Sequence, residues 1–157
     1  MTIKNDQDFK QALSGLSIVA QRQLAAQFIE SVGQLNAAPV IGRALKIAKS
    51  EYSENEIEEV YKQVKSLAVK TYTSCGAETD WSSQAAHFVV TATKACLTPQ
   101  MHLDNKKNLA WKCAMQTRMA RNCEMIETDS DIVDNEAQKQ YIIADDFLAV
   151  QTERKEL

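Results

Sequence analysis

Glycine and proline are scarce in this sequence, with 4 glycines and 2 prolines among 157 residues. Together they make up about 4% of the chain, against roughly 12% in average proteins. Backbone turns with positive φ depend on glycine, and each strand pair of a β-sandwich or propeller needs its own turn. The scarcity argues against many-stranded folds. Phosphate-binding loops are excluded as well, because neither G-x-G-x-x-G nor G-x-x-x-x-G-K occurs.

Aromatic residues and long apolar runs are also lacking. Aromatics are only 6% of the chain, so the core must consist largely of Ala, Leu, Ile, Val and Met, a mixture that favours helices. No stretch approaches the ~18 consecutive apolar residues that a transmembrane helix needs. The first residues include acids and no apolar signal segment, so we expect a cytoplasmic protein without membrane association.

The four cysteines, Cys75, Cys96, Cys113 and Cys123, are expected to be reduced thiols in that compartment. None are in C-x-x-C spacing, which argues against a zinc ribbon or a thioredoxin-type redox pair. Cys75 lies near the end of a predicted helix, where the helix dipole raises rather than lowers a thiol pKa. We therefore predict no cysteine nucleophile.

Local start and stop signals predict six or seven helices. The clearest is the capping box of Ser53 and Glu56, in which each side chain bonds the other residue's backbone amide. The predicted ranges are about 6–13, 18–32, 39–48, 54–75, 81–96, 105–126 and 135–151. We predict an all-α fold that forms a single domain over residues 1–157, either a helical bundle or a short helical-repeat array, with a frayed charged tail over 152–157.

An internal regularity motivates the repeat alternative. Trp81, Trp111 and Tyr141 recur at intervals of 30 residues, and an Asp-Asn pair precedes each of the last two. Equal spacing of helix caps and inward aromatics is typical of stacked helical units, although a coincidence of helix and loop lengths is the favoured explanation. Gly42 is the one glycine within a predicted helix, and we expect it to allow close approach of another helix.

Charge is distributed unevenly along the chain. Residues 1–103 are neutral, residues 104–123 carry a net charge of +4, and residues 124–157 carry −7. We expect the basic and acidic segments to neutralise each other on neighbouring surfaces. The acidic third argues against nucleic acid as the main partner and favours a basic protein partner. The proposed contact residues are Asp129, Asp131, Asp134 and Asp145.

These features predict a non-catalytic protein that acts through contact with an unknown protein partner or through self-association, in a regulatory, adaptor or immunity-type role. The sequence contains no G-x-S-x-G nucleophile elbow, and we predict no cofactor. The alternative is a helical bundle that binds a small ligand or metal. Its donors are His87, Cys96, Cys113 and Cys123, which lie on adjacent predicted helices. Against it, buried cysteine usually behaves as a small hydrophobe.

Overall fold

A computed structural model describes residues 2–50, 52–77, 80–103, 108–128 and 135–156. These residues form seven α-helices and two short 3-10 helices, which confirms the predicted all-α fold. The elements are α1 (Asp6–Ser14), α2 (Ile18–Glu30), η1 (Gly33–Leu35), α3 (Pro39–Ala48), α4 (Glu54–Ala77), α5 (Trp81–Cys96), η2 (Gln100–His102), α6 (Leu109–Thr128) and α7 (Glu136–Glu156). None of the described helices combines the length and the apolar character that a membrane span requires.

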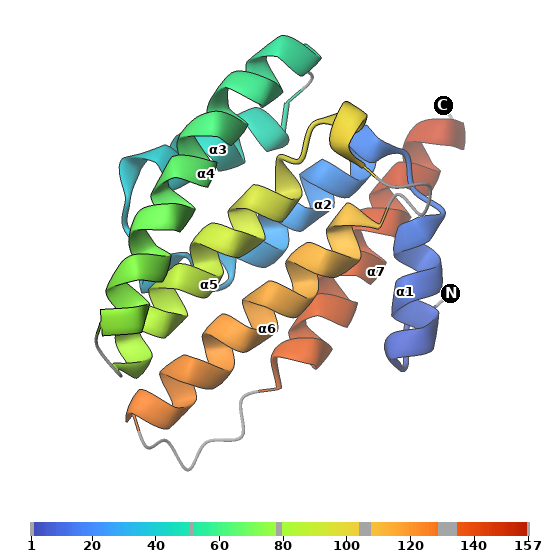
Figure 1. The fold of residues 1–157 in the computed structure, drawn as a ribbon. Coiled ribbons are helices and arrows are strands. Elements are labelled where there is room, and N and C mark those ends of the chain that lie inside the picture. The colour runs from blue at the N-terminus through green and yellow to red at the C-terminus, as the bar shows by residue number, and fades with distance from the viewer. Residues whose placement is uncertain (1, 51, 78–79, 104–107, 129–134, 157) are drawn as a thin grey trace.

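The helices form two layers (Figure 1). Helices α4, α5 and α6 make one layer, and α3, α2 and α7 lie behind them. Helix α1 packs against α6 at one edge. Helices α5 and α6 run antiparallel and share the most extensive contact, and α2 packs across both. Helices α5 and α6 are thus central, and for α6 the apolar residues on most of its sides fit this position.

Side-chain caps fix most helix starts, as the sequence predicts. Ser17 Oγ accepts a hydrogen bond from Ala20 N at 3.1 Å, and Asp80 Oδ1 accepts one from Ser82 N at 2.9 Å. At the start of α4, the Glu56 amide donates to Ser53 Oγ at 3.3 Å. Each cap satisfies an amide that has no partner within its own helix, so short polar side chains set these boundaries locally.

Phe9 fixes α1 to the rest of the molecule. Its ring is fully buried and packs edge-on against Phe28 of α2 at 5.6 Å and against Tyr141 of α7 at 5.3 Å. Trp111 of α6 lies 6.0 Å from the same ring. One side chain thus joins four helices, and aromatic pairs of this geometry contribute about 0.5–1.5 kcal/mol each beyond area burial.

Ion pairs connect the basic segment to acids in two different places. Arg121 pairs with Glu124 and Glu136, which confirms for this residue the expected neutralisation by the acidic segment. Arg118 instead bonds both carboxylate oxygens of Asp6, at 2.8 and 3.0 Å, and so links α6 to α1. The neutralisation is therefore shared between the C-terminal acids and the first helix.

Three expectations differ from the structure. Trp81 is 40% exposed, whereas Trp111 and Tyr141 pack on Phe9, so the equal spacing does not give the three aromatics equivalent environments. A Cβ built on Gly42 would meet no atom within 4 Å, so the predicted close helix approach is wrong. Residues 152–156 continue α7 rather than forming a frayed tail.

Candidate functional site

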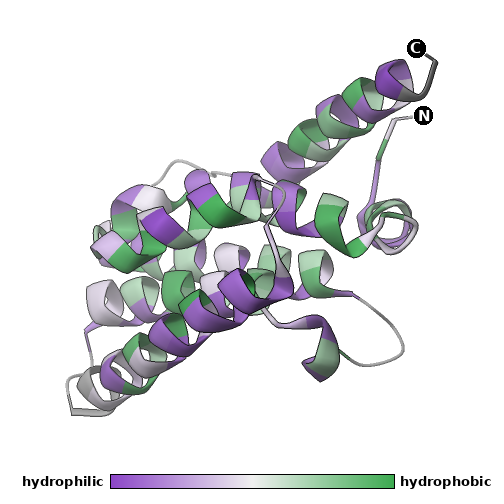
Figure 2. Ribbon diagram, turned by 90° about the horizontal axis from the view of Figure 1, so that it is seen from above, coloured by the Kyte–Doolittle hydropathy of each residue, from purple (hydrophilic) through white to green (hydrophobic). Residues whose placement is uncertain are grey.

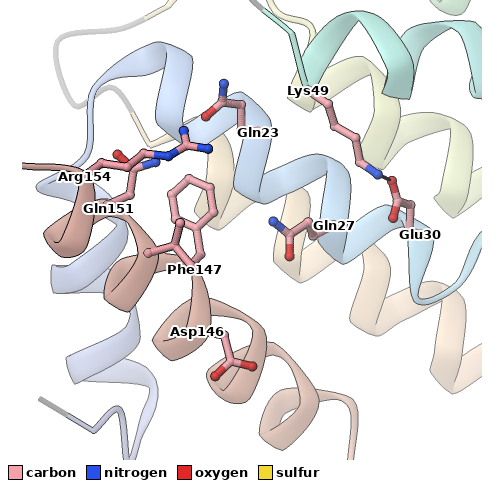
Figure 3. Close-up of a pocket in the computed structure, with 9 residues that line it drawn as sticks. Gln23, Gln27, Glu30, Lys49, Asp146, Phe147, Gln151 and Arg154 are labelled. Carbon is pink, nitrogen blue, oxygen red and sulfur yellow. Dashed lines mark ion pairs between the residues drawn. The ribbon is translucent and has the colours of Figure 1, made fainter. Parts of the chain in front are cut away.

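An open groove runs between α2 and α7, with a volume of about 560 Å³ (Figure 3). We call it the α2–α7 groove. Its lining comprises Gln23, Gln27, Glu30, Lys49, Asp146, Phe147, Val150, Gln151 and Arg154. Residues from both ends of the chain meet here, so the groove exists only in the folded molecule.

The rotation of α7 about its axis is fixed by a buried glutamine. The Gln140 side-chain amide donates to Ala114 O at 2.9 Å and to Thr117 Oγ1 at 2.7 Å, both on α6. Its Oε1 accepts a hydrogen bond from Arg118 Nε at 2.8 Å. Because every polar atom of this buried side chain has a partner on α6, a rotated α7 would leave it unsatisfied. In the orientation that Gln140 fixes, Phe147 and the residues one helical turn after it face α2.

The α2 wall is polar because it is the outward stripe of that helix. Gln23, Gln27 and Glu30 follow helical spacing, while Leu24 and Phe28 between them are fully buried. Figure 3 shows Gln27 opposite Phe147, and Glu30 joined to Lys49 by an ion pair. Amide groups here donate and accept hydrogen bonds, so this wall can bond a peptide backbone or polar side chains.

The α7 wall of the groove carries apolar side chains and two charged side chains of opposite sign. Phe147 is partly buried against the core, and Val150 is 47% exposed. Arg154 lies near Gln23 at one end of the groove, and Asp146 lies at the rim (Figure 3). An apolar centre with a polar, charged rim is the composition of a protein-binding surface.

The four residues of the metal alternative do not form a ligand set. The described part of the chain contains no group of three or more His, Cys, Asp or Glu that could hold a metal ion. The thiols of Cys96 and Cys113 instead donate to carbonyls of α2, Arg22 O at 3.4 Å and Ala25 O at 3.6 Å. Cys123 is a buried thiol on α6.

The environments of Cys96 and Cys113 also oppose reactivity. Burial raises the pKa of Cys96 to about 12 and raises that of Cys113 well above its ordinary value. His87 lies between α4 and α5 with its Nδ1 2.7 Å from Thr71 Oγ1, and burial lowers its pKa. Thiols kept protonated are poor nucleophiles and poor metal ligands. These residues pack the helix interfaces.

The structure describes one of the four acids that were predicted to form the binding surface. Asp129, Asp131 and Asp134 lie outside the described residues. Asp145 is partly buried, and its two carboxylate oxygens accept hydrogen bonds from Ile3 N at 3.1 and 3.2 Å. Asp145 therefore ties the N-terminal segment to α7, while its neighbour Asp146 reaches the groove.

Sequence reasoning did not identify Phe147, Val150 or the glutamines of α2. By helical spacing, Tyr141, Ala144 and Leu148 form one apolar face of the last helix. Ile142 and Val150 are apolar but lie outside that face. A helix that buries one stripe does not need apolar residues on its other sides, so these two residues were the sequence signal of a second contact surface. Ile142 is 61% exposed.

No protein family, curated protein or solved structure matches this chain in the comparisons made. The chemistry of the groove is therefore the basis for assigning a function.

Proposed function

We propose that the protein acts without catalysis, by binding a partner protein in the α2–α7 groove. The observation that carries the proposal is Val150, a valine 47% exposed beside Phe147 in a groove otherwise walled by amide and charged side chains. Exposed apolar side chains within a polar rim mark interaction sites. Central apolar anchors supply most of the binding energy at such surfaces.

The partner that fits this groove presents an apolar side chain flanked by basic residues. The apolar side chain would cover Phe147 and Val150, and a basic residue would meet Asp146 at the rim. The surrounding segment, residues 124–157, carries a net charge of −7, which steers basic partners towards this end of the chain. Asp129, Asp131 and Asp134 belong to this segment, and we propose that they contribute to steering.

We propose that binding of such a partner serves a regulatory, adaptor or immunity-type role. We also propose a cytoplasmic location. Cys96 and Cys113 are free thiols, and free thiols are typical of reducing compartments.

The groove is tested by placing a charge on either wall. Val150→Arg changes α7 and Gln27→Arg changes α2, while Val69→Arg on α4 is the matched control, because Val69 is 63% exposed and lies outside the groove. Affinity capture from the native host, followed by titration of the recovered partner, measures binding. Loss of a buried anchor costs about 2 kcal/mol or more, so we expect at least about 30-fold weaker binding for the two groove variants.

The control should bind the partner like the wild type. A partner that binds Val150→Arg and Gln27→Arg with unchanged affinity would exclude the groove as the docking site. Replacing Asp129, Asp131 and Asp134 with Asn tests steering separately, with a slower association rate as the expected result.

A further inference from the structure

A second groove lies between α5 and α6, with a volume of about 430 Å³. We call it the α5–α6 groove. Its lining comprises Thr91, Lys94, Ala95, Thr98, Trp111, Lys112, Met115 and Gln116. These lining residues include two lysines and no carboxylate.

Small side chains create this groove. Ala92 and Cys96 of α5, with Cys113 and Ala114 of α6, are fully buried and let the two helices pack closely. A hydrogen bond of 2.7 Å from Thr91 Oγ1 to Gln116 Oε1 joins the helices across it. The larger side chains of Trp111 and Met115 therefore stand beside a shallow, largely apolar channel.

Two lysines stand at the rim of the channel. Lys94 on α5 and Lys112 on α6 line it from opposite helices. Lys10 of α1 adds a third ammonium group, 5.3 Å above the Trp111 ring. Trp111 itself is held by Phe9 at 6.0 Å, so the aromatic surface is preorganised. An apolar channel with cations on both sides fits a helix whose exposed stripe alternates apolar and acidic residues.

The chain itself carries such a stripe on the outer face of α7. Ile142, Asp146, Ala149 and Glu153 are spaced by four, three and four residues, which places them in one line along the helix. All four are exposed, and Ile142 is 61% exposed. Figure 2 shows the C-terminal turns of α7 extending beyond the neighbouring helices, where another molecule can reach them.

We propose that the α5–α6 groove binds this α7 stripe from a second copy of the chain. Ile142 and Ala149 would cover Trp111 and Met115, and the acidic side chains would meet the lysines. Each copy carries both surfaces, so a two-fold pair contains the contact twice. Asp146 also lines the α2–α7 groove, so Asp146→Lys affects both surfaces. Gln27→Arg and the lysine variants separate the two proposals, because each changes a residue of one surface only.

Sedimentation equilibrium of the purified protein tests the proposal across a concentration series. We expect self-association that weakens as salt rises from about 0.05 M to about 0.5 M. The double variants Lys94→Glu with Lys112→Glu, and Asp146→Lys with Glu153→Lys, should each weaken it about tenfold or more. Mixing the two variants should restore association, because each reversed surface then meets a complementary one.

The matched control is Lys62→Glu with Lys65→Glu, since both lysines are exposed on α4. This control and Gln27→Arg should associate like the wild type. Circular dichroism checks that each variant folds. If the variant with both Lys94→Glu and Lys112→Glu does not fold, the single variant Lys94→Glu takes its place.

A wild type that stays monomeric to roughly millimolar concentration overturns the proposal. So does a mixture of the reversed variants that fails to associate. Single-stranded oligonucleotide binding that Lys94→Glu abolishes, without self-association, would assign the groove to nucleic acid instead.

Discussion

The buried ion pair between Arg121 and Glu136 offers the sharpest test of how α7 is held. The Glu136 side chain is 4% exposed and that of Arg121 is 10% exposed, and their Nε and Oε2 atoms lie 3.3 Å apart. Glu136 Oε1 also accepts a hydrogen bond of 2.6 Å from Ser31 Oγ, at the end of α2. The pair therefore joins α2, α6 and α7 at one point.

Removing one partner should be costly, because it leaves the other charge buried. Losing one member of a buried pair costs about 3–5 kcal/mol. Arg121 keeps Glu124 as a second partner, so we expect Glu136→Leu at the lower end, about 3 kcal/mol. For a domain of this length, that loss lowers Tm by roughly 6–12 °C. Glu136→Gln should cost about 1–2 kcal/mol, since an amide can still accept from Arg121 and donate to Ser31.

The double variant separates electrostatic coupling from packing. Arg121→Met with Glu136→Leu removes both charges, and replacement of a buried pair by apolar residues is often nearly neutral. We therefore expect the double variant to be more stable than Glu136→Leu alone, with a coupling free energy of about 2–3 kcal/mol.

Urea unfolding followed by far-UV circular dichroism gives all the free energies of unfolding in this cycle. Additive losses in the double variant, or a cost below about 1 kcal/mol for Glu136→Leu, would refute the reasoning. Lys139→Met is the control, because the Lys139 side chain is half-exposed and its ammonium group lies 3.9 Å from Glu136, so we expect the loss of this solvated charge to cost little.

Three further predictions concern stability and reactivity. Gly42→Ala should stabilise the protein by about 1 kcal/mol in urea unfolding, because an added Cβ meets open space and alanine favours a helix; a loss of stability would contradict this. The hydrogen bond from Arg118 holds the pKa of Asp6 below its ordinary value. The unfolded chain therefore takes up that proton first as pH falls, so this stabilisation is present above about pH 4 and is lost at lower pH. Asp6→Asn should be less stable at neutral pH and should show a flatter acid dependence. Cys96 and Cys113 should resist iodoacetamide in the native protein and react in urea, as read by peptide mass mapping, because burial keeps both thiols protonated; equal labelling in both conditions would contradict their placement.

The fold class and most helix boundaries follow from local signals in the sequence. Ser17, Ser53 and Asp80 cap the helices that follow them, and Pro39 begins α3. These signals depend on hydrogen bonds and dihedral angles within three or four residues, so they can be recognised without knowing the rest of the fold. The central position of α6 was also predictable, because its apolar residues surround the helix.

Which helix faces meet and which side chains remain exposed depends instead on packing between distant parts of the chain. Trp81 and Trp111 both lie in the first turn of a helix, yet Phe9 from the first helix packs on Trp111, while Trp81 is 40% exposed. Gly42 lies inside a helix as predicted, but no neighbour approaches it. The side of α7 that faces α2 depends on hydrogen bonds of Gln140 to residues more than 20 positions away. Local sequence patterns carry no information on such distant partners, so both grooves, which lie between helices, became visible only in the folded chain.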